Sequence, residues 1–290
     1  MERKIAESEL IINSDGSVFH LHIKPEMLAD NVILVGDPAR VNLVASFFDK
    51  ITHEVSSREF HTICGEYKGK PIMCVSHGIG ADNIDIVINE LDALANIDFN
   101  TRTVNKNFRQ LTLIRIGTSG SVQEDIPVGS MVISQKALGI DGAFHFYKDS
   151  EKYRDIELEN EFIKQTNWKE IWNHPYIVDA DEELVNRLKT DEMFLGMTVT
   201  ANGFYGPQGR ELRLSISDPN FKQALNHFKY NNFRVTNFEM ESAMLQGLAK
   251  LMGHKAITIC SIIAGRMSSS ANTNYKGSIE DLIETVLNRL

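Results

Sequence analysis

The chain has 290 residues, of which 42% are hydrophobic and 24% charged, with only 19 glycines and 7 prolines. These values are typical of a globular protein and exclude disordered, collagen-like and coiled-coil chains. With 30 basic and 39 acidic residues the formal net charge is −9, which argues against binding to a nucleic-acid polymer. A small anion held by a few converging arginines remains compatible with this charge.

The cysteines and the apolar segments predict a cytoplasmic protein without membrane contact. Cys64, Cys74 and Cys260 show no CxxC spacing, and two of them lie in apolar runs, so we expect buried free thiols in a reducing compartment. Glu7 and Glu9 interrupt the apolar residues near the N-terminus, which is unlike a signal peptide. The longest apolar stretch, residues 256–265, is far shorter than the ~20 residues of a membrane-spanning helix.

The order of predicted elements indicates a single α/β domain. Short apolar runs rich in Val and Ile alternate with helical patterns, which is typical of a mainly parallel sheet flanked by helices. No internal repeat or low-complexity linker divides residues 1–290. The predicted strands are 32–35, 72–76, 112–116, 131–135, 197–201, 234–238 and 256–263. The predicted helices are 39–48, 83–95, 182–189, 218–228, 239–252 and 278–289.

Two segments do not fit this alternation. Residues 100–110 are polar, basic and aperiodic, and we interpret them as a surface loop or a polar extension of a helix. Residues 144–162 mix aromatic with charged side chains. This mixture favours an exposed excursion, with a lid as the less favoured alternative.

The first motif that could carry chemistry is VILVGDPARV, residues 32–41. A buried strand ends at Gly36, Asp37 can cap the following helix, and Pro38 suits its first turn. A glycine permits close approach of a ligand, and the free N–H groups of a helix start favour an anion, toward which Arg40 would point. A plain strand–turn–helix with a surface arginine is the alternative.

The second motif is LTLIRIGTSGS, residues 111–121, in which Arg115 interrupts an apolar strand. A buried guanidinium is costly unless it is paired or lines a ligand site, so a salt bridge to a core carboxylate is a serious alternative. The turn expected at 117–120 offers hydroxyl groups suited to phosphate oxygens and favours the ligand site. Arg58, beside Glu59, is a third basic residue that no helix-face pattern explains.

The third motif is FEMESAM, residues 238–244, where a strand gives way to a helix. Glu239 and Glu241 flank Met240 at this junction. Carboxylates at a helix start can simply complement the helix dipole. They can equally bind paired sugar hydroxyls, because a carboxylate offers several acceptor positions in one plane.

The fourth motif is NGFYGPQGREL, residues 202–212, whose glycines shape a loop. The loop displays Phe204, Gln208 and Arg210, and an aromatic face, an amide and a guanidinium suit a heterocyclic base with carbonyl groups. An ordinary glycine-rich loop is the alternative.

The histidines do not predict a metal site. His20 and His22 would share one face of a strand, but no third ligand is within reach in the sequence. No HExxH or clustered Cys/His pattern occurs, and no GxSxG motif indicates a serine nucleophile.

Taken in order, these motifs resemble those of the nucleoside phosphorylase family. The matching segments, from about residue 20 to residue 266, are HLHI, VGDPARV, SREF, HGIG, RIGTSGS, FYGPQGR, FEMES and SIIAGR. Each segment alone is weak, but the ordered set is specific. The resemblance implies one α/β domain with a central mixed, largely parallel β-sheet flanked by helices. It also implies phosphorolysis of a nucleoside, and the FYxxQxR pattern is similar to the branch that cleaves uridine.

The resemblance also implies a role for each matching residue. The phosphate site would comprise Gly36, Arg40, Arg115 and Thr118, with Arg58 lent by a neighbouring subunit. The ribose site would comprise Thr118, Glu239, Met240 and Glu241, with the neighbour's His20 at the 5′-hydroxyl. The base site would comprise Phe204, Gln208 and Arg210, with Arg266 supporting their loop. The residues implied to act in catalysis are Arg115, Gln208, Arg210 and Glu241.

The implied reaction uses phosphate as co-substrate and requires no metal, hydride carrier or covalent nucleophile. Some relatives hold a monovalent cation between subunits through the SREF glutamate and a serine. Here Glu59 is present but Asn83 stands at the serine's position, which argues against the cation. Because two site residues would come from a neighbour, we expect a homodimer or a hexamer built from dimers.

Three other functions remain as alternatives. Purine nucleoside phosphorylases of the similar bacterial branch place an acidic aspartate where this chain has Gly265. A nucleosidase of the same fold would not need the set of Arg40, Arg58 and Arg115. A non-catalytic nucleoside sensor would not need the contact residues of both substrates.

Overall fold

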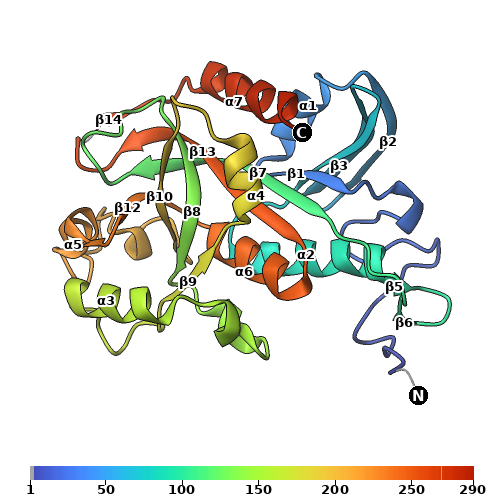
Figure 1. Cartoon of the computed structure of the whole chain (residues 1–290), viewed down its shortest axis with the longest axis horizontal. Coiled ribbons are helices and arrows are strands. Elements are labelled where there is room, and N and C mark those ends of the chain that lie inside the picture. The colour runs from blue at the N-terminus through green and yellow to red at the C-terminus, as the bar shows by residue number, and fades with distance from the viewer. Residues whose placement is uncertain (1–2, 269) are drawn as a thin grey trace.

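A single twelve-stranded sheet runs through the molecule, and helices cover it (Figure 1). The computed structural model describes residues 3–268 and 270–290. The strands of the large sheet are β1 Asn31–Val35, β2 Lys50–Ser57, β3 Phe60–Tyr67, β4 Lys70–Ser76, β7 Thr112–Ser121, β8 Met131–Gly139, β9 Tyr176–Asp179, β10 Phe194–Thr200, β11 Lys229–Tyr230, β12 Phe233–Glu239, β13 Lys255–Gly265 and β14 Ser270–Ala271. A separate small hairpin is formed by β5 Ile97–Asp98 and β6 Thr103–Val104.

The helices are α1 Pro38–Ala45, α2 Ala81–Asn96, α3 Ile156–Thr166, α4 Glu182–Leu188, α5 Phe221–His227, α6 Ser242–Met252 and α7 Lys276–Asn288. Short 3₁₀ segments are η1 Pro25–Met27, η2 Ala143–Phe146, η3 Ser150–Tyr153 and η4 Gly206–Gln208. Across residues 3–268 and 270–290, no helix combines the length and the apolar character needed to cross a membrane.

Part of the sheet closes into a ring. β12 pairs with β10 on one side and with the end of β7 on the other, so the order β7–β13–β8–β10–β12 returns to β7. β1 and β4 extend the sheet from β7 in parallel, and the antiparallel hairpin of β2 and β3 completes the far edge. This is the mixed α/β sheet flanked by helices that the sequence predicts. Parallel pairing places the carboxyl ends of β1, β4 and β7 at one edge.

Alternate side chains of β1 pack into two different hydrophobic cores, one on each face of the sheet. Val32 and Leu34 pack on the side covered by α2 and α6, whereas Ile33 and Val35 pack on the side covered by α1, α4 and α7. All four side chains are fully buried. This two-sided burial explains why the strand reads as an uninterrupted apolar run.

Segment 144–162 is packed into the molecule, so the expectation of an exposed excursion is wrong. Phe144, Leu158 and Phe162 are buried, and the segment contains η3 and most of α3. The Phe144 ring fits against Gly247 of α6, where a Cβ atom would lie 2.9 Å from the ring. Among the charged residues of the segment, Glu159 is buried and paired with Arg154, whereas Lys148, Glu151 and Lys152 are exposed.

Two other local expectations have different outcomes. Residues 117–120 continue β7 instead of forming a turn, because their main chain pairs with β13. Residues 100–110 form the predicted surface loop, around the short strand β6. Within this loop Arg102 donates hydrogen bonds to the carbonyls of Ile5 and Ala6 at 3.0 and 3.1 Å, so the loop secures the N-terminal segment.

The three cysteines are buried free thiols, as the sequence predicts. Burial raises the pKa of Cys64 to about 11 and that of Cys260 to about 11. The thiols are therefore protonated at neutral pH and act as small apolar groups.

The packing of Phe144 generates a test of this fold. We expect Phe144→Ala to lower the free energy of unfolding by about 3–5 kcal/mol, because the change opens a cavity between η2 and α6. The matched control is Phe146→Ala in the same η2 segment, where the side chain is 92% exposed, and its effect should stay within about 0.5 kcal/mol. Denaturant titration of both variants provides the comparison, and equal effects would contradict the packing.

Candidate active site

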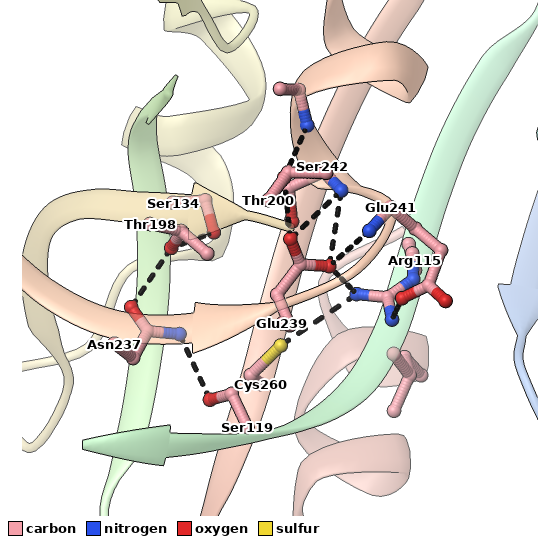
Figure 2. A network of polar contacts seen from close by, with 12 residues as sticks. Arg115, Ser119, Ser134, Thr198, Thr200, Asn237, Glu239, Glu241, Ser242 and Cys260 are labelled. Atoms are coloured by element: carbon pink, nitrogen blue, oxygen red, sulfur yellow. Dashed lines mark hydrogen bonds and ion pairs between the residues drawn. The ribbon is translucent and has the colours of Figure 1, made fainter. Parts of the chain in front are cut away.

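Arg115, in the middle of β7, is the centre of a buried network of charged groups (Figure 2). Its side chain is only 4% exposed, and its Nη1 lies 2.9 Å from Glu239 Oε2. Its Nη2 binds the carboxylate of Glu241, and Nη1 also donates to the Cys260 thiol at 3.7 Å. The salt bridge to core carboxylates that the sequence leaves open is therefore present.

Glu239 is the last residue of β12, and its carboxylate binds the main chain at the start of α6. Its carboxylate accepts hydrogen bonds from Thr200 Oγ1 at 2.6 Å, from the Glu241 N–H at 2.9 Å and from the Ser242 N–H at 3.0 Å. These main-chain groups are the unpaired donors of a helix start, so Glu239 caps α6 from the preceding strand. The helix consequently begins at Ser242 and not at 239 as predicted. With these partners and Arg115, Glu239 has little capacity to accept further hydrogen bonds.

Glu241 receives a main-chain donor from the turn that follows β4. The N–H of Gly80 donates to Glu241 Oε1 at 2.7 Å. Gly78 and Gly80 have φ values of +73° and +98°, which glycine adopts without strain. Burial raises the pKa of Glu241 to about 7; the charge of Arg115 opposes this shift and the neighbouring Glu239 adds to it.

The Arg115 guanidinium thus faces two carboxylates, and all three side chains are buried. Burial alone would lower the pKa of Arg115, but Glu241 and Glu239 outweigh it and raise the pKa above its ordinary value. Arg115 therefore remains charged, and the cluster carries one surplus negative charge when both carboxylates are ionised.

Arg40 of α1 is buried too, but its environment differs. Within residues 3–268 and 270–290 no carboxylate forms an ion pair with it, and its Nη1 donates to the Ile116 carbonyl at 3.2 Å. Burial lowers the pKa of Arg40, and the nearby charge of Arg115 lowers it further. A buried guanidinium with most donors unused is a site for an anion. The alternative of a surface arginine is wrong.

The main chain around Arg40 is compatible with a close ligand. Asp37 caps α1 as predicted, accepting the Ala39 N–H at 2.9 Å. Gly36, at the end of β1, lies so near the next turn that a Cβ atom would be 3.3 Å from the Gly78 carbonyl. Thr118 is half-buried on β7 and, by strand alternation, faces the side from which Arg40 approaches.

The predicted base-binding residues meet in the loop after β10. Arg210 donates to Gln208 Oε1 and to the Phe204 carbonyl, and its guanidinium lies 3.6 Å from the centre of the Phe204 ring. Arg266 donates to the Gln208 carbonyl at 2.9 Å, the supporting contact that the resemblance implies. Burial and the charge of Arg266 lower the pKa of Arg210 to about 10, so this guanidinium is still protonated at neutral pH.

A cavity of about 380 Å³ lies against the other side of this loop, away from Arg115. Its walls include Trp168, Trp172 and Phe221 together with Pro207 of the loop. The side chains of Gln208 and Arg210 do not line it. The charged cluster and this cavity are therefore separate features.

His20 and Arg58 lie together, and neither contacts Arg40 or Arg115. Residues 19–21 form a turn, not the strand that the HLH pattern suggested, and Glu90 of α2 accepts the His20 Nδ1–H at 2.6 Å. The Arg58 guanidinium lies 5.4 Å from the centre of the Phe19 ring, and Phe19 packs edge-on against His20. We call His20, Arg58 and Phe19 the Phe19 patch. It brings together two residues that are predicted to contact ligands, His20 and Arg58, and it lies apart from the charged cluster of the same chain.

Two further predicted positions are near this patch. Glu59 and Asn83 lie on either side of Gly78, where a Cβ atom would be 3.2 Å from Glu59 and 2.4 Å from Asn83. In the described part of the chain, no group of three or more His, Cys, Asp or Glu side chains is arranged to hold a metal ion. Met240 is half-buried between Glu239 and Glu241 at the junction of β12 and α6.

The sequence reasoning missed His77 and Thr200. The sequence assigned no role to His77, yet its Nε2 accepts the Arg115 Nε–H at 3.2 Å. Thr200 binds Glu239 and also accepts the Ala243 N–H at 2.9 Å. The available signal for His77 was its place in the HGIG run, one of the segments that carry the family resemblance.

Comparisons with known proteins show which family this chain resembles. Residues 30–288 match the model of the phosphorylase superfamily. A uridine phosphorylase of Thermococcus kodakarensis is 30% identical over 269 residues, covering 93% of this chain and 85% of the relative. A DeoD-type purine nucleoside phosphorylase of Yersinia enterocolitica is 27% identical, covering 92% of this chain and 95% of the relative.

A solved structure extends the similarity to three dimensions. A Trypanosoma brucei nucleoside phosphorylase, described as showing uridine phosphorylase activity, superposes with a TM-score of 0.88 and 28% identity. The superposition covers 97% of this chain and 99% of that one.

The raised pKa of Glu241 generates a test by pH. Its pKa is about 7 in the folded chain against an ordinary 4.5, so between these values the folded state binds the proton more tightly. Stability from this group is complete below about pH 4.5 and is lost as the pH rises to 7, by about 3 kcal/mol. Denaturant unfolding of the wild type and of Glu241→Gln at several pH values should show this loss only in the wild type. Parallel stability curves would refute it.

Proposed function

This chain belongs to the phosphorylase superfamily, and we propose that it acts as a uridine phosphorylase. It would cleave uridine with inorganic phosphate to give uracil and ribose 1-phosphate, in the reversible reaction of pyrimidine salvage. 2′-Deoxyuridine is a further candidate substrate. The family relationship supports a nucleoside and phosphate as the two substrates.

The observation that carries the phosphate assignment is the buried Arg40 beside Arg115. Arg40 uses one donor on a main-chain carbonyl, and no carboxylate in the described chain neutralises it. A phosphate oxygen would supply the missing charge and accept the unused N–H groups. The hydroxyl of Thr118, on β7, adds a donor at the same edge of the sheet.

The assignment of uracil as the base rests on Gln208 and Arg210. An amide and a guanidinium can together read a carbonyl beside an imide N–H, which is the edge that uracil presents. Arg210 rests on the Phe204 ring, 50% of which is exposed, so the base would stack near this aromatic face.

The reaction then follows from charge. Phosphate attacks the anomeric carbon while the bond to the base nitrogen breaks, so the ribose gains positive charge and uracil gains negative charge. Arg40 and Arg115 hold the phosphate in line, which makes the encounter effectively intramolecular. Glu241 accepts ribose hydroxyls, and Gln208 and Arg210 stabilise the charge on the departing base. No cofactor takes part in this proposal.

The alternative of a purine substrate is less well supported. A purine enzyme of the similar branch needs an aspartate at position 265, and a Cβ atom there would lie 2.1 Å from Ser268 Oγ. A side chain at this position therefore requires the Ser268 and Ser270 hydroxyls to turn away. Because purine phosphorylases are among the relatives, the test must include both classes of nucleoside.

The decisive assay measures release of free base from uridine and from inosine, each with and without phosphate. Uracil release that depends on phosphate, at a rate above that for inosine, is the expected result. Faster cleavage of inosine would identify a purine enzyme. Phosphate-independent cleavage would identify a nucleosidase, and binding without cleavage would identify a sensor.

The phosphate site predicts the behaviour of an Arg40 variant. Arg40→Gln should raise the KM for phosphate and lower kcat/KM for phosphate by about 10²-fold or more, because a charge-assisted contact is lost where water is excluded. Steady-state kinetics with varied phosphate measures both quantities. Arg289→Gln, an exposed arginine on the last turn of the chain, is the matched control and should behave as the wild type. An unchanged phosphate KM in Arg40→Gln would remove Arg40 from the site.

The Phe19 patch predicts an active site shared between subunits of a dimer. Arg58→Ala and Glu241→Ala should each be inactive as homodimers, because Arg58 would serve the neighbour's site and Glu241 its own. After the two variants are mixed and exchange subunits, one site of each mixed dimer carries both defects and the other carries none. Partial recovery of phosphorolysis is expected. Proven subunit exchange without recovery, or a fully active monomer, would disprove a shared site.

A further inference from the structure

His77 lies between two strands that are not neighbours. It is the first residue after β4, is completely buried, and its main-chain N–H donates to the Val35 carbonyl at 2.8 Å. Its imidazole nevertheless reaches Arg115 on β7, although β1 separates β4 from β7 in the sheet. Gly36, just after β1, lies beside the imidazole, where a Cβ atom would be in ordinary contact at 3.7 Å from His77 Cε1.

The contact between His77 and Arg115 determines the protonation state of the imidazole. An arginine carries only donors, so His77 Nε2 must accept the Arg115 Nε–H, and the ring proton is on Nδ1. Burial lowers the pKa of His77 well below its ordinary value, and the charges of Arg115 and Arg40 act in the same direction. The imidazole is therefore a neutral acceptor at physiological pH.

The hydrogen bonds of Arg115 show what this acceptor controls. Of the five N–H groups of a guanidinium, Nε serves His77, Nη1 serves Glu239 and Cys260, and Nη2 serves Glu241. One N–H, on Nη2, is left for a ligand. The two carboxylates and the Cys260 thiol hold the Nη end of the group, and His77 is the acceptor that holds its Nε end.

A histidine at position 77 lowers the stability of the fold if its role is only to fill space. In residues 3–268 and 270–290 its Nδ1 has no hydrogen-bond partner, although it is buried. An unsatisfied buried donor destabilises a fold, and an apolar side chain of similar size would avoid this cost. The histidine is therefore better explained by its acceptor atom than by packing.

We propose that His77 is a positioning residue for the anion site, holding the Arg115 guanidinium so that its one unused N–H faces the phosphate beside Arg40. This inference rests on the proposed phosphate-dependent function. It adds the residue that orients Arg115, whereas Arg40 and Arg115 themselves contact the anion.

The test compares two substitutions of equal length. His77→Gln keeps an acceptor oxygen near the position of Nε2, whereas His77→Met fills the same space without one. We measure the KM for phosphate and the KM for uridine, and we measure binding of inorganic phosphate to each resting protein by calorimetry. Thermal unfolding of each variant verifies that the compared proteins are folded.

We expect His77→Met to raise the phosphate KM and the calorimetric Kd about 10-fold or more, the usual effect of losing a hydrogen bond to a charged group. The uridine KM should change less than about threefold, and His77→Gln should recover most of the phosphate affinity. If the role of His77 is purely structural, both variants should instead lose phosphate affinity to the same extent. The KM values for phosphate and for uridine should then change together. Equal loss in the two variants, or wild-type phosphate affinity in His77→Met, would overturn the proposal.

The calorimetric measurement separates this inference from the proposed function. If the wild type binds phosphate but releases no uracil from uridine, the uridine assignment fails, and the comparison of the His77 variants still decides the role of His77. If the wild type does not bind phosphate, both conclusions are overturned. A His77→Met protein that does not fold is replaced by His77→Leu, judged by the same criteria.

Discussion

A guanidinium buried against two carboxylates holds the candidate site together. Removing these three charges from water is costly, and only close pairing with further hydrogen bonds compensates for it. The two carboxylate partners of Arg115 come from the end of β12 and the start of α6 (Figure 2). Glu241 in turn accepts a hydrogen bond from the turn after β4. The ion cluster therefore fixes three segments relative to β7. Closure of the strand ring, which brings β12 beside β7, is what makes this pairing possible.

The two buried arginines illustrate how the same residue type takes different roles. Arg115 has nearly all of its donors occupied by protein groups, so its position is set before any ligand binds. Arg40 has one protein acceptor and no carboxylate in the described chain, so its charge is available. A pre-organised cation next to an unsatisfied one suits an anion that must be both held and oriented. The base-reading loop is organised separately, through the contacts of Arg210 and Arg266 with Gln208.

Much of the fold was predictable wherever a local pattern reports burial. The apolar run before Gly36, the capped start of α1 and the charge inside β7 all carry their signal within about ten residues. The hairpin of β2 and β3 was missed because β2 is polar and largely exposed at the edge of the sheet. Segment 144–162 was misjudged because its charged residues obscure the spacing of Phe144 and Phe162. Phe144 is buried against α6, and Phe162 is buried against Trp168 and Phe228, so these partners lie outside the segment.

The sequence by itself determined the kind of protein, an α/β phosphorylase superfamily member, and the residue types of its site. Only the tertiary structure decided which of those residues binds other protein groups and which is left to bind a ligand. Whether a buried arginine is saturated or available depends on acceptors that are distant in the chain: Glu241 lies 126 positions from Arg115, and His77 lies 38 positions from it. Local patterns cannot report such partners, because hydrogen bonds and desolvation act through space and are settled only when the strands and turns have met.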